Sequence, residues 1–414
     1  MSFSRQHGTL TVEDCAVDDL AARFGTPLYV YSRAAIESAW RAYDAAFADR
    51  DHLICYAVKA NGSLAILQLL ARLGSGFDIV SGGELERVLQ AGGDPSRVVF
   101  SGVGKTTSEI ERALEVGILA FNVESESELE RLSEVATRLG REAPVSLRVN
   151  PDVDARTHPY ISTGLRDNKF GIDIHAAEAV YTRAAERPGL RVEGLDFHIG
   201  SQLTELEPLA DALSRSLALV DRLAEQGLPL KHLDIGGGLG IRYENETPPS
   251  PAALAESLGA LLKDRPQRVL MEPGRAIVGA AGLLVSRVEY LKPGHRDFAI
   301  VDAAMTDLLR PALYDAWQRI EAVNTTADET RLYDVVGPVC ETADVLGRER
   351  ALALSPGALI AIFDAGAYGF VMASQYNARP RPAEVLVDGA EAHLIRTRER
   401  VDDLWRGEHL LEAP

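Results

Sequence analysis

Residues able to do chemistry stand at the ends of several short apolar runs in this sequence. Lys59 closes one run, Leu53 to Val58, which reads as a buried strand. Three further runs end in the polar motifs Asp196-Phe197-His198-Ile199-Gly200-Ser201, Asp234-Ile235-Gly236-Gly237-Gly238 and Glu272-Pro273-Gly274-Arg275. Because an α/β barrel carries its chemistry at the carboxyl ends of its strands, we expect these motifs to share one site.

Taken alone, each motif also has a plain structural interpretation. A strand-end lysine is often solvated, a glycine triplet is more often a tight turn, and Asp78 equally suits a helix cap. We expect the three bare amides of 236–238 to lead into a helix and, with Gly274 in the next loop, to form a nest for a phosphate. The recurrence of such residues at strand ends favours a site over packing.

The elements that must position these residues alternate between strand-like and helix-like runs from about residue 50 to 275. The expected strands are Leu53–Val58, Phe77–Val80, Val98–Ser101, Ala120–Val123, Val145–Val149, Gly194–His198, His232–Ile235 and Val269–Glu272. Helical spacing predicts helices over Leu64–Leu73, Gly83–Ala91, Ser125–Leu139 and Glu205–Gln226. Eight units predict an α/β fold, a (β/α)8 TIM barrel, with a doubly wound sheet as the alternative.

After Arg275 the pattern changes to strands separated by turns, which predicts an all-β module. Its expected strands are Gly282–Leu291, Asp297–Asp302, Leu332–Val336, Ala358–Phe363 and Glu384–Val387, with a helical insertion over Pro311–Ile320. The N-terminal segment has no helix partner and is expected to join this module. The predicted domains are therefore 1–30 with the β domain, 31–278 as the barrel, and 279–414 as a β-sandwich or β-barrel-like domain.

Composition excludes several functional classes. The chain has 414 residues, 46% of them hydrophobic, and a formal net charge of −18, which disfavours binding to nucleic acid or to an anionic membrane surface. The most apolar window, Ala351 to Ala373, is interrupted by Pro356 and Asp364, so we expect no membrane span. Three widely spaced cysteines argue against a disulfide framework and a zinc site, and they suit the cytoplasm; we expect no metal.

With the further motif Gly337-Pro338-Val339-Cys340-Glu341, these segments resemble the pyridoxal-phosphate-dependent decarboxylases of the alanine racemase-like barrel fold, fold type III. The resemblance is closest to the branch that acts on diaminopimelate, and it runs from Phe24 to Asn377. It implies pyridoxal 5'-phosphate as cofactor, a small-molecule substrate, and a homodimer whose active sites are shared between subunits. The reaction implied is decarboxylation of meso-2,6-diaminopimelate to L-lysine, the last step of lysine biosynthesis.

The resemblance also implies a role for each candidate residue. Lys59 would form the Schiff base with the cofactor and Asp78 would position it, while Glu272 would keep the pyridine nitrogen protonated, which favours decarboxylation over racemisation. His198 would stack on the ring. The remaining cofactor contacts implied are Ser201, Gly236, Gly237, Gly238, Gly274, Arg275 and Tyr368.

Cys340 in the β module would, by the same resemblance, return a proton to the substrate carbon in the partner subunit's site. The substrate contacts implied are Glu341, Arg275, Arg310, Tyr314 and Tyr368, with the arginines on the distal carboxylate. Two segments, His158 to Gly164 and Asn168 to Gly171, are expected to form a loop over the barrel mouth.

Other functions stay open. A sister decarboxylase acting on lysine, ornithine, arginine or carboxynorspermidine is the first, although its substrate would leave Arg310 and Tyr314 unpaired. A catalytically inactive regulator is opposed by the presence of both Lys59 and Cys340, and a small pyridoxal carrier is opposed by the length of the chain.

Overall fold

The computed structural model describes residues 2–153, 169–326 and 329–412 and divides into two compact units. The barrel unit comprises Glu37–Arg242 and Glu246–Ile277. The β unit comprises Met1–Ile36, Tyr243–Asn245 and Val278–Pro414. In the part of the chain that the structure describes, every helix is too short or too polar to cross a membrane.

The core of the barrel unit is a closed ring of eight parallel strands. In ring order they are β5 (His52–Ala57), β6 (Gly76–Ile79), β7 (Val98–Phe100), β8 (Ala120–Val123), β9 (Ala143–Asn150), β11 (Leu190–Asp196), β12 (His232–Asp234) and β13 (Arg268–Met271). A short strand, β10 (Ile172–Asp173), pairs with the end of β9. All eight predicted strands are present, so the predicted barrel is confirmed and the doubly wound alternative is wrong.

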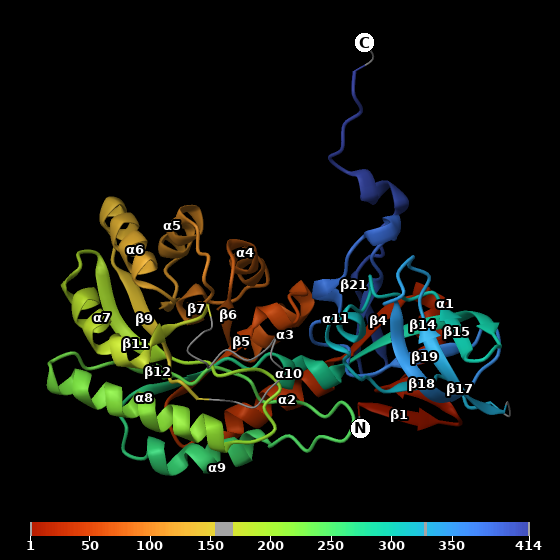
Figure 1. Ribbon diagram of the computed structural model, residues 1–414, viewed down its shortest axis with the longest axis horizontal. Helices are drawn as coiled ribbons and strands as arrows, with labels where there is room; N and C mark the ends of the chain where they lie inside the picture. The colour runs from red at the N-terminus through yellow and green to blue at the C-terminus, as the bar shows by residue number, and fades with distance from the viewer. Residues whose placement is uncertain (1, 154–168, 327–328, 413–414) are drawn as a thin grey trace. The chain divides into compact units, whose positions relative to one another are not determined.

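Helices surround the strands of the barrel (Figure 1). They are α2 (Arg33–Ala46), α3 (Leu64–Arg72), α4 (Gly82–Gln90), α5 (Thr107–Val116), α6 (Glu126–Leu139), α7 (Ile174–Glu186), α8 (Glu207–Glu225), α9 (Pro251–Leu262) and α10 (Arg275–Val278). Local signals fix their ends, as in α5, where Thr106 and Glu109 form a capping box and Gly117 ends the helix at φ 75°. The buried residues of α5, Ile110, Ala113 and Leu114, recur at the three- and four-residue spacing of one helix face.

The β unit is built on one large sheet. Its strands are β4 (Leu28–Ser32), β14 (Gly282–Lys292), β15 (Asp297–Val301), β16 (Ile320–Ala322), β17 (Thr330–Val336), β18 (Val345–Ala353), β19 (Leu359–Ile362), β20 (Ala383–Asp388) and β21 (Glu391–Arg396). Strand β4 lies between β14 and β20, antiparallel to the first and parallel to the second. Apolar residues of the N-terminal segment, such as Val12 and Val30, therefore share a core with Leu283 and Val385.

Smaller elements complete both units. They are β1 (Phe3–Gln6), β2 (Thr9–Val12), β3 (Cys15–Ala16), α1 (Val17–Phe24), α11 (Arg310–Tyr314), η1 (Val58–Ala60), η2 (Pro95–Arg97), η4 (Gly279–Ala281), η5 (Phe370–Met372), η6 (Tyr376–Ala378) and η7 (Val401–Trp405). The helix predicted over Pro311–Ile320 is wrong in extent. It ends at Tyr314 because Asp315 takes a left-handed conformation at φ 49°, and Ile320 already begins β16.

Candidate active site

Lys59 lies in the single turn η1 that directly follows β5. Its Nζ donates to Oδ2 of Asp78, which stands in the neighbouring strand β6 opposite Ala57. The Asp78 side chain is completely buried, whereas the Lys59 side chain is 36% exposed. The ends of these two strands thus place the Asp78 carboxylate inside the barrel and the Lys59 amine at the barrel mouth.

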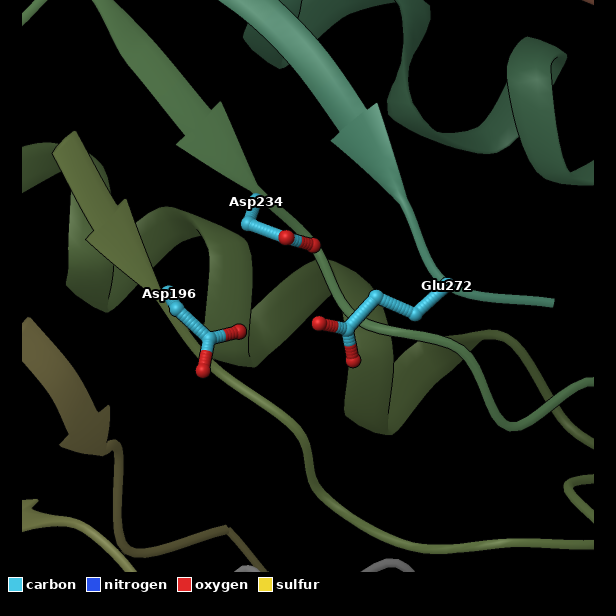
Figure 2. Close-up of side chains that lie close together, drawn as sticks. All are labelled: Asp196, Asp234 and Glu272. Atoms are coloured by element: carbon cyan, nitrogen blue, oxygen red, sulfur yellow. The ribbon is translucent and has the colours of Figure 1, made fainter. Parts of the chain in front are cut away.

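Three carboxyl groups meet at the ends of the strands β11, β12 and β13. Asp196, Asp234 and Glu272 are buried, and one oxygen of each lies within 4.8 Å of the others (Figure 2). Buried groups of like charge cannot all ionise. Burial and the charge of Asp78 raise the pKa of Asp234 to about 7. Burial and the neighbouring Asp234 likewise raise the pKa of Asp196 well above its ordinary value.

Glu272 is the acid of this cluster that follows the last barrel strand. Burial, and then the charges of Asp234 and Asp78, raise its pKa well above the usual range. Its Oε1 accepts from Ser101 Oγ at 3.3 Å and from Asn122 Nδ2 at 3.2 Å. The Glu272 side chain is therefore held in place and prone to keep a proton until a cationic group comes close.

His198 lies two residues beyond the end of β11, beside the glycine turn. The Gly237 N–H donates to His198 Nδ1 at 3.2 Å, so Nδ1 is the acceptor and a neutral ring carries its proton on Nε2. Burial, and then the charges of Arg148 and Lys59, lower the pKa of His198 well below its ordinary value. The imidazole is thus neutral at neutral pH.

The glycine turn follows β12, and only glycine fits its centre. A Cβ on Gly237 would lie 2.1 Å from the Glu272 carbonyl oxygen, while Gly236 has φ 67° and donates to Asp234 Oδ1 at 2.9 Å. The expected helix after the triplet is wrong: residues 239–250 are irregular, and α9 begins only at Pro251. The expected nest of three bare amides is wrong as well, because the Gly236 and Gly237 N–H groups donate to Asp234 and His198. Among the described residues the turn leaves the Gly238 N–H for an anion, with no helix dipole behind it.

Arg275 and Ser201 meet near the same strand ends. Arg275 is 5% exposed, begins α10, and donates from Nη2 to Ser201 Oγ at 3.0 Å. Gly274, just before it, packs on the turn that carries Lys59, because a Cβ there would lie 3.0 Å from Ala60 Cβ. The barrel unit therefore gathers all the candidate residues assigned to it from sequence.

The remaining candidates lie in the β unit. Cys340 is exposed, and its N–H donates to Asn377 Oδ1 at 2.9 Å. The adjacent Glu341 accepts from the Tyr376 hydroxyl at 2.7 Å, and this hydrogen bond raises the pKa of Tyr376. Because Cys340 is exposed, the structure gives it no role in filling the core.

Arg310 and Tyr314 begin and end the short helix α11. The Arg310 guanidinium carbon lies 5.7 Å from the centre of the Tyr314 ring and 5.2 Å from that of Tyr243. Tyr368 lies in the turn after β19 with φ 55°. The loop expected over the barrel mouth, His158 to Gly164 with Asn168, lies outside the described residues; Lys169 to Gly171 are described.

Several residues of this site are not predicted by the sequence. Asp196 and Asp234 stand within the strand-end motifs without a predicted role, and Asn122 and Ser101, which hydrogen-bond to each other and to Glu272, carry no local signal in the sequence. A detectable signal existed for Arg148, a single charged residue inside the apolar strand β9, which lies 8% exposed with its Nε 3.9 Å from Asp196 Oδ2. A charge in the middle of a buried strand requires a partner.

A closed barrel that gathers a lysine, a neutral histidine, buried acids and a glycine turn at its strand ends has the site of a cofactor-dependent barrel enzyme. Residues 33–279 match the family described as "Pyridoxal-dependent decarboxylase, pyridoxal binding domain". The chain belongs to this family of pyridoxal-dependent decarboxylases.

The chain also matches curated proteins and solved structures over nearly its whole length. The chain is 60% identical over 411 residues to the diaminopimelate decarboxylase of Pseudomonas aeruginosa, covering 99% of both proteins. The diaminopimelate decarboxylase of M. jannaschii in co-complex with L-lysine is 38% identical, with a TM-score of 0.95 over 99% of this chain and 98% of that one. The enzyme of Helicobacter pylori complexed with L-lysine is 44% identical, with a TM-score of 0.91 over 94% and 98%.

Proposed function

We propose that this protein decarboxylates meso-2,6-diaminopimelate to L-lysine and carbon dioxide with pyridoxal 5'-phosphate, the last step of lysine biosynthesis. The observation that carries this proposal is the match at 60% identity over 99% of both chains to a diaminopimelate decarboxylase. We further propose that it acts as a cytoplasmic homodimer with shared active sites.

The residues at the barrel mouth fit the cofactor. Buried oxygens of Asp78, Asp196 and Asp234 have no hydrogen-bond partner among the described residues, so the mouth has spare acceptors for a ligand that donates a proton or carries positive charge. A protonated pyridine nitrogen would supply the matching cation, and the Gly238 N–H with the Ser201 hydroxyl offers donors to a phosphate. Bound pyridoxal phosphate supplies an electron sink for the pair left on the substrate carbon when carbon dioxide leaves.

Each barrel residue then has a task that follows from its position. Lys59 would hold the cofactor through its Nζ, with Asp78 fixing the direction of the side chain. Glu272, which keeps a proton when no cation is near, would share that proton with the ring nitrogen and hold it there. His198, neutral and oriented by the Gly237 amide, would present a flat face to the ring without adding charge.

The β unit would read the far end of the substrate and handle its proton. We assign Arg310 and Tyr314 to the distal carboxylate, since a guanidinium grips a carboxylate through two hydrogen bonds. Glu341 suits the distal ammonium, and the exposed Cys340 thiol would deliver a proton to the substrate carbon. Arg275 and Tyr368 complete the proposed contacts to substrate and cofactor.

A sister decarboxylase is the second candidate and is tested by the same assay. The purified protein, supplied with pyridoxal phosphate, is given meso-diaminopimelate, L-lysine, L-ornithine, L-arginine or carboxynorspermidine, and released carbon dioxide is measured. We expect release from meso-diaminopimelate with an equal yield of L-lysine, and none from a Lys59→Ala control. Faster release from another substrate would assign the sister activity, and no release from any would favour an inactive homologue.

A further inference from the structure

Two buried ion pairs lie side by side in the barrel unit, next to the acid cluster. Lys105 Nζ lies 2.7 Å from Glu128 Oε1, and Arg148 Nη1 lies 2.8 Å from Glu124 Oε1. The four side chains are between 1% and 9% exposed. The pairs are linked because the N–H of Glu124 donates to the second oxygen of Glu128 at 3.1 Å.

The Lys105 pair fixes the backbone at the end of β8. A buried ammonium is costly unless its three N–H groups are used, and Lys105 uses them on Glu128, the Gly102 carbonyl at 2.7 Å and the Asn122 carbonyl at 2.8 Å. Asn122 in turn donates from its side chain to Glu272. Asn122 therefore connects Lys105 to Glu272 of the acid cluster through hydrogen bonds.

Glu124 makes a second connection to the acid cluster, through Arg148. Besides Arg148, its carboxylate accepts from the Gly102 N–H at 3.2 Å and from the Gly171 N–H at 2.8 Å. Three donors from separate segments, Arg148 inside β9, Gly102 after β7 and Gly171 before β10, thus hold one carboxylate, which leaves the bound guanidinium little freedom. Glu124, Asp196 and Glu272 in turn raise the pKa of Arg148 above its ordinary value against the effect of burial, so this arginine is a permanent cation beside the acids.

We infer that Glu124 is a positioning residue for the proposed decarboxylation, holding the Arg148 guanidinium beside Asp196 and thereby setting the charge of the cluster Asp196, Asp234 and Glu272. The inference rests on the proposed function. Its physical basis is that a buried cation acts strongly on carboxylates only within a few ångströms, so a displaced Arg148 would leave the acids to repel one another.

The first test compares Glu124→Gln with Glu126→Gln two residues along. Glu126 also pairs with an arginine, Arg183, but its side chain is 55% exposed, so it controls for loss of an ion pair. In the holoenzyme we expect Glu124→Gln to lower kcat/KM for meso-diaminopimelate at least ten-fold, mostly through kcat. We expect Glu126→Gln to stay within two-fold of wild type. Equal behaviour of the two variants overturns the inference.

A double-mutant cycle separates positioning from a merely structural role. If Glu124 acts through Arg148, Glu124→Gln added to Arg148→Met should cause no further fold-change in kcat/KM. Losses that multiply would show that Glu124 acts independently, and the inference would fail. Glu124→Asp keeps the charge but shortens the reach, so we expect it to be as impaired as Glu124→Gln; wild-type activity in Glu124→Asp would mean that charge alone matters.

Cofactor affinity gives a readout that does not need turnover. Pyridoxal phosphate is titrated into each apoprotein and the quenching of tryptophan fluorescence is followed; we expect the Kd to rise several-fold in Glu124→Gln and Glu124→Asp and not in Glu126→Gln. Unchanged affinity in both Glu124 variants contradicts the inference. If wild type binds the cofactor but releases no carbon dioxide from diaminopimelate, the proposed function fails, while this titration still decides the role of Glu124.

Discussion

Lys59 and Asp78 form an ion pair between the ends of two adjacent parallel strands, with the carboxylate fully buried and the lysine partly exposed. A carboxylate fixed by the strand β6 can orient the lysine but cannot follow it into solvent. The pair therefore sets the direction in which the amine meets a ligand at the barrel mouth.

We expect reduction of the purified protein with borohydride, in the presence of pyridoxal phosphate, to leave the cofactor covalently on Lys59. The amine is held at the mouth and partly exposed, so a ligand can reach it. Peptide mass analysis locates the adduct. An adduct only on a different lysine would remove Lys59 from its proposed role.

Glu272→Gln should lower turnover by roughly 10²-fold and change cofactor affinity little, because the glycine turn and Ser201 stay while the ring nitrogen loses its acid partner. Turnover is measured with saturating diaminopimelate, and affinity by fluorescence titration. Glu256→Gln on the exposed side of α9 is the matched control. Unchanged turnover in Glu272→Gln would exclude this residue from the chemistry.

Arg310→Ala should weaken kcat/KM for diaminopimelate by about 2–3 kcal/mol, as for one lost charged hydrogen-bonding contact, and leave the visible absorption of the bound cofactor intact. The exposed Arg348 in β18 provides the control variant Arg348→Ala. The product L-lysine keeps the distal carboxylate, because the carboxylate that leaves is the one on the reacting carbon, whereas 1,5-diaminopentane has no carboxylate. We therefore expect Arg310→Ala to weaken binding of L-lysine and not of 1,5-diaminopentane; an equal loss of affinity for 1,5-diaminopentane would show that Arg310 does not contact that carboxylate.

Mixed chains test whether sites are shared between subunits. Lys59→Ala and Cys340→Ala, each nearly inactive alone, should recover roughly a quarter of wild-type activity when co-expressed, because random pairing gives half heterodimers with one intact site each. Differently tagged chains allow the heterodimer to be isolated and assayed. Heterodimers without activity would place both residues in the same subunit's site.

His232 makes stability depend on pH. Burial, and then the charges of Arg268 and Lys231, lower its pKa to about 4, and its Nε2 lies 2.6 Å from Ser146 Oγ. Between about pH 4 and 6.5 the unfolded chain binds a proton that the folded chain does not, so stability rises with pH across this window, by about 3 kcal/mol in all. Above pH 6.5 this contribution is complete.

The measurement is the melting temperature of wild type and His232→Gln at pH 7.5 and pH 4.5. We expect the difference in melting temperature between wild type and His232→Gln to be smaller at pH 4.5 than at pH 7.5, because only wild type then loses the contribution of His232. Ser146→Ala removes the hydrogen-bond partner but keeps the imidazole, so its difference from wild type should change less between the two pH values. A constant difference for His232→Gln would contradict the assigned pKa.

The barrel could be predicted from sequence because most residues of its strands are buried, so that the strands read as short apolar runs. The hydrogen-bond partners within the site could not be predicted from sequence. Asn122 and Glu272 are 150 residues apart and meet only because the ring closes, and no local pattern records that closure. The helix predicted over Pro311–Ile320 was too long for a related reason. Pro311 signals the start of a helix, but nothing in the sequence before Asp315 signals its end.

Strand β4 is made long before its neighbours. Its five residues, Leu28–Ser32, are all buried, yet its partners β14 and β20 begin only at Gly282 and Ala383. During synthesis from the N-terminus the whole barrel unit is made after β4 and before either of its partner strands. We therefore expect this apolar strand to be exposed with both edges unpaired on the ribosome, and residues 28–32 to be a segment that a chaperone would shield until β14 and β20 are made.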